Sequence, residues 1–298
     1  MCLLLKIRKK TLPLPPHYHP FNPELMSRNI YADNFGDLPP VTKNLLIVNV
    51  LCFIVAGLFE EAYQLPASQY LGLHIPVASD FYIFQYVTSM FMHGSISHLF
   101  FNMLCLWMFG APVERFVGSR RFFQYYMLTG IFAGVLYSLI IWYRFLPDIQ
   151  LFDTFLQTPN ADTLTQLFNK FELYSTESKQ ILLEQLRGSN SLTLAQDIAT
   201  AVGEYKDSWL NSHVAVGASG ALYGVLLAFG MLFPSAIIYL FMFIPMPARM
   251  AVIVFAISEL SFEFANMPGD NIAHLAHLTG MLVGYILVKY WRLDRFIK

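Results

Sequence analysis

Apolar stretches close to the length of a membrane span recur six times along the chain, and this feature restricts the fold more than any other. A helix needs about 20 mostly apolar residues to cross the hydrocarbon core of a bilayer. Hydrophobic residues make up 56% of the 298 residues and charged residues only 13%, whereas about 25% of the residues of a soluble domain are charged. The pattern predicts an all-α membrane protein with six transmembrane helices.

The six predicted spans divide into two groups of three. They cover about residues 41–63, 97–117, 122–143, 218–233, 248–264 and 271–291. Residues 43–144 contain the first group, and residues 214–298 contain the second group with a basic C-terminal end. Residues 1–42 hold seven of the sixteen prolines. Proline at this density prevents a continuous helix, so we expect a cytoplasmic or interfacial segment there.

Residues 145–213 interrupt the apolar pattern. They carry nine acidic and four basic residues and predict a soluble helical insertion. Spacing of i, i+3, i+4 and i+7, typical of an amphipathic helix, occurs at Leu164, Leu167, Phe168 and Phe171. A second helix is expected between Thr176 and Gly188. A third is expected around the repeat of Leu194, Ile198 and Val202.

Basic residues predict the orientation, because cytoplasmic loops are enriched in lysine and arginine. With both termini in the cytoplasm, 14 of the 19 basic residues lie on the cytoplasmic side. The opposite orientation reverses this ratio. We therefore expect cytoplasmic termini and an insertion on the outer side. No transit-peptide pattern is recognised, which favours the plasma (inner) membrane of a bacterium.

Charge and cysteine content exclude further classes of protein. The formal net charge of −1 excludes a strongly basic nucleic-acid binder. Cys2, Cys52 and Cys105 are too few and too scattered for a disulfide framework or a zinc ribbon. We expect no cofactor and no bound metal.

Ionisable and strongly polar residues within the spans point to function, because they are costly in lipid. The second span holds His98 and Asn102 one helical turn apart, with His93 just upstream. The sixth holds His274 and His277, three residues apart and so on one face.

The fourth span is too short to cross the bilayer alone, which places its beginning below the outer surface. Ser219 is expected in the first helical turn, where backbone amides are free and the helix dipole favours negative charge. A serine at such a position can act as a nucleophile beside amides that stabilise an oxyanion.

Small residues predict that the fourth and sixth spans approach closely. Gly220 and Gly224 form one small-residue face, and Gly280 and Gly284 form another. Because His277 lies one turn before Gly280, this contact brings its imidazole toward the Ser219 hydroxyl. Imidazole is the usual base that activates serine.

A catalytic dyad is the simplest interpretation of these residues, because no carboxylate is obviously placed to orient the imidazole. Glu259 and Glu263 are candidates by position alone, and we expect Glu259 to be a buried acid with satisfied hydrogen bonds. His98 and Asn102 are suited to donate to an oxyanion.

These residues form motifs that resemble the rhomboid family of intramembrane serine proteases. The motifs are His93-x4-His98-x3-Asn102, Gly217-Ala-Ser219-Gly220 and Ala276-His277-x2-Gly280-x3-Gly284, with a similar Glu114-x3-Gly118 after the second span. The similarity covers about residues 41–291 except the insertion. It implies hydrolysis, through an acyl-enzyme, of a peptide bond in or beside the transmembrane helix of a membrane-protein substrate.

The resemblance also implies roles for single residues. Ser219 is the expected nucleophile and His277 the base, while His98, Asn102 and the Ser219 amide form the oxyanion hole. Tyr223 is expected to pack against His277, and His93 to hydrogen-bond the first long loop. The remaining supporting positions are Gly217, Gly220, Gly280 and, in a structural role, His274. The fifth span and the loop at 263–271 are the expected gate and cap.

Two features depart from the family pattern. The loop at 64–92 lacks the Trp-Arg pair common in rhomboids, and the insertion between the third and fourth spans is unusual. The insertion could recruit substrate or restrict access, and we favour a passive surface module.

Three other functions compete with a protease. A membrane metalloprotein could gather His93, His98, His274 and His277 around zinc or haem, but no His-Glu-x-x-His pattern is present. A non-catalytic rhomboid-like binder usually lacks one member of the dyad, and both are present here. A transporter is disfavoured because no inverted repeat is apparent.

Overall fold

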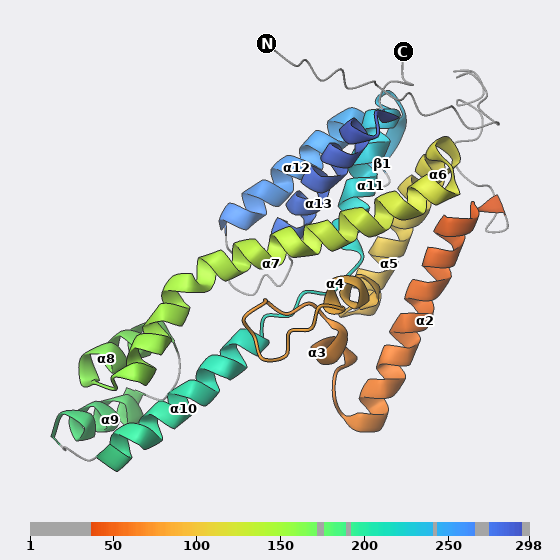
Figure 1. Cartoon of the computed structure of the whole chain (residues 1–298). Coiled ribbons are helices and arrows are strands. Elements are labelled where there is room, and N and C mark those ends of the chain that lie inside the picture. Colours follow the sequence, from red (N-terminus) through yellow and green to blue (C-terminus); the bar gives the residue numbers. More distant parts are fainter. Residues whose placement is uncertain (1–36, 172–175, 189–191, 241–242, 266–273, 294–298) are drawn as a thin grey trace, which may run out of the picture.

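The structure, a computed structural model, describes residues 37–171, 176–188, 192–240, 243–265 and 274–293. Within these ranges the chain is mainly helical (Figure 1). The predicted loop at 263–271 and the segment 1–42 therefore lie mostly outside the described residues. Three stretches in the described part are long and apolar enough to cross a membrane: α2 (Pro40–Tyr63), Ile96–Val117 and α7 (Ser119–Gln157).

Helix α2 begins two residues before the predicted boundary at 42, with a proline in its first turn, where a missing N–H costs nothing. One face carries buried residues near its start, including Leu45 and Leu46. Leu51, Val55 and Leu58 are exposed. An apolar helix with this distribution presents its outer face to lipid.

The stretch Ile96–Val117 matches the predicted second span and consists of three consecutive helical parts. They are α5 (Ile96–Cys105), a π-helical turn η3 (Leu106–Gly110) and α6 (Ala111–Val117). Ser95 caps the beginning, because its Oγ accepts a hydrogen bond from the His98 amide at 3.1 Å. This cap fixes the start of the helix that carries His98 and Asn102.

Helix α7 contains the predicted third span and continues past residue 143 to Gln157, with Pro147 inside it. Proline normally interrupts a helix. Here packing on both sides of the proline favours continuation. Phe145 contacts Trp209 of α10 with ring centroids 4.8 Å apart, and Phe152 is fully buried.

The segment 145–213 contains the predicted helices and has its own hydrophobic core (Figure 1). The helices are α8 (Ala161–Lys170), α9 (Thr176–Gly188) and α10 (Leu192–Asn211). The core contains all four residues of the first amphipathic pattern, with Ile198 and Val202 from the third. Phe152 and Phe155 at the end of α7 complete it.

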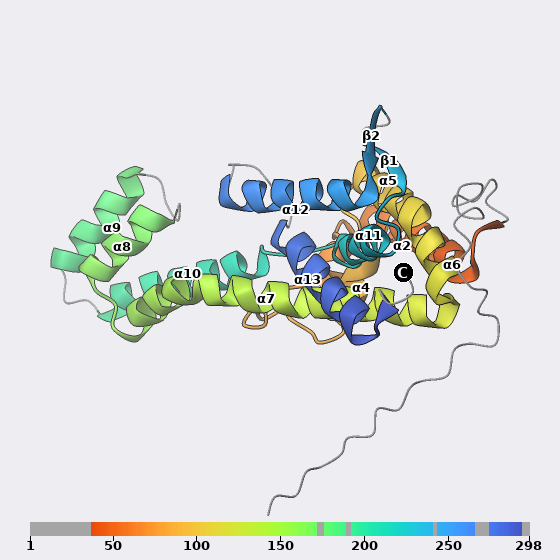
Figure 2. The same ribbon diagram turned by 90° about the horizontal axis from the view of Figure 1, so that it is seen from above.

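Helix α11 (Ser219–Leu232) lies at the centre of the bundle, among α13 (His274–Tyr290), α7, α12 (Ala248–Ala265) and α5 (Figure 2). Fourteen residues extend only about 21 Å at 1.5 Å per residue. In Figure 1, α11 begins well short of the end of the bundle at which α2 ends. Its first residue therefore lies inside the bundle.

The connection between α11 and α12 contains a short antiparallel hairpin, β1 (Ile237–Leu240) and β2 (Ile244–Pro247). Ile237 is paired with Pro247, and Leu240 with Ile244. This hairpin is a small exception to the predicted all-α fold. The apolar run at 237–244 is too short to cross the membrane. Its residues Ile237–Leu240 and Ile244 take part in strand pairing, which satisfies backbone groups.

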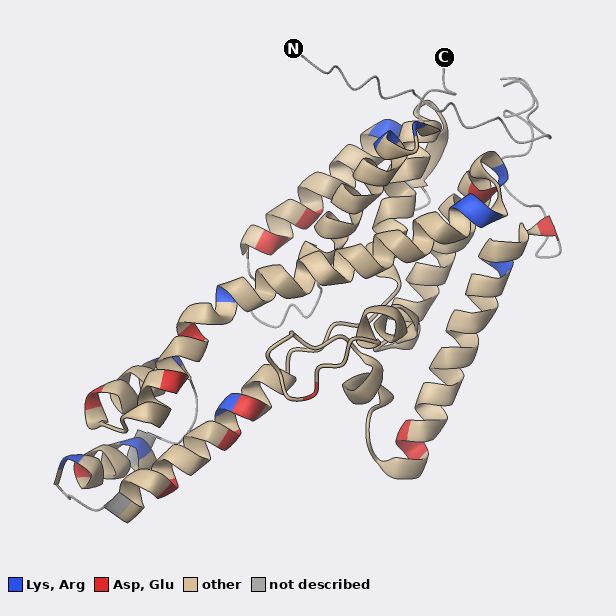
Figure 3. Cartoon of the chain, in the orientation of Figure 1, with Lys and Arg blue, Asp and Glu red and all other residues tan. Residues whose placement is uncertain are grey.

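Charges are scarce along the bundle and concentrated near its ends and in the 145–213 segment (Figure 3). The first residue of α2 and the last of α13 lie at one end, opposite α8 to α10 (Figure 1). Helix α12 differs from its neighbours because it carries Glu259 and Glu263 within an otherwise apolar sequence. Glu259 is buried.

Candidate active site

Ser219 is the first residue of α11, as predicted, and the segment before it is held in place by backbone hydrogen bonds. Leu73 and Ala215 exchange two such bonds of 2.9 Å, and the Gly217 amide donates to the Ser89 carbonyl at 2.9 Å. Gly217 has φ +124°, a conformation that strongly favours glycine. The chain can therefore turn sharply into α11, and the loop at 64–92 fixes where that turn lies.

Helices α11 and α13 meet at glycines, which confirms the predicted close approach. A Cβ added at Gly280 would lie 2.0 Å from the Gly220 carbonyl oxygen, so the two backbones are in direct contact. At Gly284 it would lie 2.8 Å from the Gly224 Cα. A side chain at either position on α13 would push the helices apart.

This contact brings His277 beside the beginning of α11. The imidazole lies parallel to the Tyr223 ring, with centroids 4.1 Å apart and 7° between the planes. Tyr223 is one helical turn after Ser219, and His277 is one turn before Gly280. Stacking and glycine contact together place the imidazole on the face of α11 that carries Ser219 and Tyr223.

Glu259 is the residue that sequence reasoning underestimated. Its Oε2 lies 3.0 Å from His277 Nδ1 and 2.5 Å from His274 Nδ1. The Tyr223 hydroxyl donates a hydrogen bond to Oε1. The carboxylate thus touches the expected base, although the dyad interpretation left it without a role. The spacing from 259 to 277 contains no signal, because it spans two helices and a loop.

His274 takes the structural position that was predicted for it. Its ring is buried and stacks on Phe262, with centroids 5.3 Å apart, while its Nδ1 faces Glu259. Glu263, the other acidic candidate, lies elsewhere. Its Oε1 accepts a hydrogen bond of 2.5 Å from Arg144 of α7.

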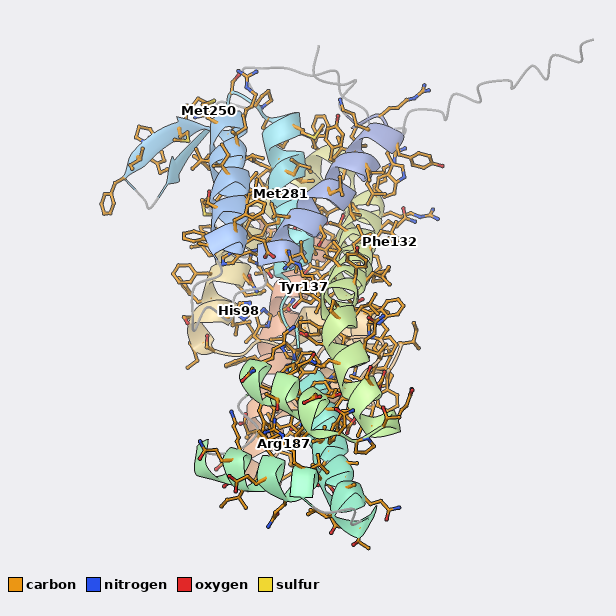
Figure 4. All side chains as sticks on the ribbon, turned by 90° about the vertical axis from the view of Figure 1, so that its left-hand side faces the viewer. His98, Phe132, Tyr137, Arg187, Met250 and Met281 are labelled. Atoms are coloured by element: carbon orange, nitrogen blue, oxygen red, sulfur yellow. The ribbon has the colours of Figure 1, made fainter. Side chains whose placement is uncertain are left out.

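His98 and Asn102 lie against the turn that precedes Ser219. A Cβ at Gly217 would come within 2.8 Å of His98 ring atoms and 3.6 Å of Asn102 Nδ2. Figure 4 shows His98 at the level where α11 and α13 begin. Asn102 Nδ2 is buried without a hydrogen-bond partner among the described residues. A buried donor without a partner is costly, and an oxyanion would supply the missing acceptor.

The hydrogen bond expected between His93 and the first long loop stays a prediction. Both ring nitrogens are buried, and in the described ranges neither has a hydrogen-bond partner. The ring meets His98 edge to face, with centroids 5.1 Å apart. Burial, followed by the neighbouring His98, lowers the pKa of His93 to about 4, so the ring is neutral near pH 7.

A small cavity of about 50 Å³ adjoins Ser219. Its walls come from α7, α11, α13, the turn before α11 and the loop at 64–92, and include Ser89, Tyr137, Gly217 and Ala276. One or two water molecules fit a space of this size. The cavity therefore provides room for the water that hydrolysis needs.

A metal site of four histidines does not form. Among the described residues, the donor atoms that lie together, within 4.8 Å of one another, belong to Glu259, His274 and His277. His93 and His98 form a separate pair and are not members of this group.

Comparison with known proteins decides the family. The sequence model of the Rhomboid domain matches residues 80–144 and 171–292. The chain belongs to the rhomboid family. The rhomboid match leaves out residues 145–170, which form the end of α7 and the whole of α8.

Individual rhomboids are distant relatives. The chain is 27% identical over 271 residues to "Rhomboid protein 1, mitochondrial" of Saccharomyces cerevisiae, covering 86% of this chain and 57% of that protein. It is 28% identical over 95 residues to "Rhomboid protease GlpG" of Salmonella choleraesuis, covering 32% of this chain and 33% of that protein. "Rhomboid-like protein 15" of Arabidopsis thaliana is 28% identical over 108 residues, covering 35% and 25%. The matches thus span between a quarter and just over half of the length of these relatives.

The fourth rhomboid-like motif fixes the scaffold of this rhomboid. Glu114 is buried and accepts hydrogen bonds from the Val41 amide, the Thr42 amide and Thr42 Oγ1 at 3.0, 2.7 and 2.8 Å. A carboxylate at the start of α2 satisfies free amides and complements the helix dipole. It joins α2 to α6 at the end of the bundle opposite α8 to α10.

Proposed function

We propose that this rhomboid is an intramembrane serine endopeptidase that cleaves a peptide bond in or near the transmembrane helix of membrane proteins. The observation that carries the proposal is the parallel stack of Tyr223 on His277 at the beginning of α11, one turn from Ser219. This stack supports a base close to a hydroxyl at a helix N-terminus inside an apolar bundle.

The chemistry follows from that placement. Ser219 Oγ attacks the carbonyl carbon while His277 accepts its proton. His98, Asn102 and the Ser219 amide donate to the oxyanion, and each such donor is worth about 2.7–4 kcal/mol in serine proteases. The C–N bond then breaks, and the imidazolium protonates the leaving amine. Water, deprotonated by His277, hydrolyses the acyl-enzyme and restores the serine.

The membrane arrangement that fits this chemistry has six spans. These are α2, the stretch 96–117, the first part of α7, α11, α12 and α13. The start of α2 and the end of α13 lie on the same side of the bundle (Figure 1). The distribution of 14 of 19 basic residues favours a cytoplasmic location for that side. The 145–213 segment then lies outside.

We favour the bacterial plasma membrane as the location. Because the chain is also similar to a mitochondrial protein of yeast, the location needs an experimental test. Fusions of a cytoplasm-specific and a periplasm-specific reporter after residue 298 and within 145–213 test it in a bacterium. The proposal requires opposite reporters to be active at the two positions.

Cleavage is tested by co-expression with single-span membrane proteins that carry tags at both ends and small residues near the outer end of the helix. We expect Ser219→Ala and His277→Ala to abolish the appearance of cut fragments, while both variants keep the unfolding temperature of the wild type in detergent. Fragments that persist in Ser219→Ala, or that disappear when a chelator is added to the wild type, would overturn the serine mechanism.

A further inference from the structure

We propose that Glu259 is a positioning residue for His277, so that the catalytic unit is a Ser219–His277–Glu259 triad rather than a dyad. The inference rests on the proposed function. It assigns a task to a carboxylate that neither the rhomboid-like motifs nor the proposed mechanism uses.

The first observation is the nitrogen that Glu259 faces. Its Oε2 lies 3.0 Å from Nδ1 of His277, and both side chains are buried. The two atoms are close enough for a hydrogen bond but are not aligned as one, and Nδ1 has no aligned partner among the described residues. Catalytic hydrogen bonds are often poorly aligned before substrate binds and tighten in the complex. A carboxylate beside Nδ1 favours the tautomer with hydrogen there, which leaves Nε2 to accept the serine proton.

The second observation is that the carboxylate is itself held on both oxygens. The Tyr223 hydroxyl donates to Oε1, and His274 Nδ1 lies 2.5 Å from Oε2. Three helices therefore determine where this group lies: α11 through Tyr223, α13 through His274 and α12 through its own backbone. Ionisable groups within a bundle are costly unless they are paired. This one is paired with the groups that surround the expected base.

The third observation is the contrast with Glu263, one turn further along α12. That carboxylate is bound by Arg144 and does not belong to the group that contains the two histidines. Both residues are glutamates on the same helix, but among these two Glu259 is the one whose carboxylate contacts His277. Glu263 is therefore a matched control.

The chemical task is known from soluble serine proteases. There a buried carboxylate holds the histidine in the correct tautomer and stabilises the imidazolium that forms when the serine attacks. No proton needs to reach the carboxylate. Replacing that carboxylate by its amide lowered kcat about 10⁴-fold in a soluble protease, with the geometry intact.

The same three side chains could instead hold a metal ion, and their spacing argues against it. Two ligands of one zinc ion at bond lengths of about 2.0–2.1 Å in tetrahedral geometry lie about 3.3 Å apart. One oxygen of Glu259 is 2.5 Å from His274 Nδ1 and 3.0 Å from His277 Nδ1. These separations fit shared protons better than a shared ion.

The test compares Glu259→Gln, Glu259→Asp and Glu263→Gln in the full chain, reconstituted in lipid vesicles. Two readouts are taken: kcat and KM on a tagged single-span protein that the wild type cleaves, and the rate at which a fluorophosphonate labels Ser219. The second readout needs no substrate helix to enter. We expect Glu259→Gln to lower kcat and the labelling rate about 10²- to 10⁴-fold, with KM within about 2-fold. Glu259→Asp should recover part of both rates. Glu263→Gln should leave the labelling rate unchanged, because that readout does not depend on the expected gate and cap.

The opposing results are distinct. Wild-type labelling and kcat in Glu259→Gln would refute the positioning role while leaving Ser219-dependent cleavage in place. Equal losses in Glu259→Gln and Glu263→Gln, together with a lower unfolding temperature, would show a structural role only. Inactivation of the wild type by a chelator would favour the metal. If the wild type neither labels at Ser219 nor cleaves any test protein, the proposed function itself fails.

Discussion

The Tyr223 ring lies flat against the His277 imidazole, with 4.1 Å between the centroids. The same tyrosine donates its hydroxyl to Glu259. One side chain thus supports the expected base in two ways, by its ring face and by its hydroxyl. These two contributions can be separated by mutation.

Tyr223→Phe keeps the stacked ring and removes the hydroxyl, whereas Tyr223→Ala removes both. A hydrogen bond to a charged group contributes about 1.5–3 kcal/mol, so we expect Tyr223→Phe to reduce the rate of Ser219 labelling by about 10- to 100-fold. Tyr223→Ala should reduce it further, because the imidazole loses its support as well. Labelling rates measured in one detergent compare the variants. Equal rates in Tyr223→Phe and the wild type would mean that the hydroxyl does not act through Glu259.

Gly280→Ala is expected to separate α11 from α13. The added Cβ would lie 2.0 Å from the Gly220 carbonyl oxygen, and overpacking of this kind costs about 1–3 kcal/mol. We expect a lower unfolding temperature and slower labelling of Ser219. Gly57→Ala on α2 is the control, because nothing lies within 4 Å of a Cβ there. A Gly280→Ala variant as stable and as reactive as Gly57→Ala would contradict the close contact.

Asn102→Ala tests the buried amide beside the turn at Gly217. Its Nδ2 has no hydrogen-bond partner in the described structure, so truncation should cost little stability. Loss of an oxyanion donor lowers kcat about 10²- to 10³-fold, and we expect that loss with an unchanged KM. Asn49→Ala is a control on α2, where the amide donates a hydrogen bond of 2.7 Å to the Leu45 carbonyl. Similar kcat values for the two variants would exclude Asn102 from the oxyanion hole.

Leu167→Ala tests whether the 145–213 segment is stabilised by its own core. Leu167 is fully buried in that core, and truncation of a buried leucine costs about 2–5 kcal/mol. We expect faster hydrogen exchange and proteolysis within α8 and α10, with normal labelling of Ser219. Gln166→Ala, at an exposed position, should change neither. Loss of labelling in Leu167→Ala would instead show that the segment is needed for the active site.

Local patterns predicted the helices well because hydrophobicity and residue spacing can be read from residues that are close in the sequence. The apolar runs located α2, α11 and α12 to within a few residues, and glycine spacing located the contact of α11 with α13. The amphipathic pattern of Leu164 and Leu167 likewise identified residues of a core.

What could not be predicted depends on contacts between distant residues. Continuation of α7 past Pro147 is favoured by the packing of Phe145 on Trp209 and the burial of Phe152. The role of Glu259 depends on how α12 lies beside α13, and no spacing rule connects residues 259 and 277. The edge-to-face contact of His93 with His98 also depends on tertiary packing, which the resemblance did not supply.

The unbroken course of α7 has a mechanical consequence. One continuous helix of 39 residues packs on α11 and α13 in the bundle and on α8 and α10 beyond it. Because no loop interrupts α7 between the bundle and α8, the outer helices have no hinge in this connection. A force applied to them, for example by a bound protein, is transmitted along α7 to the wall of the cavity beside Ser219.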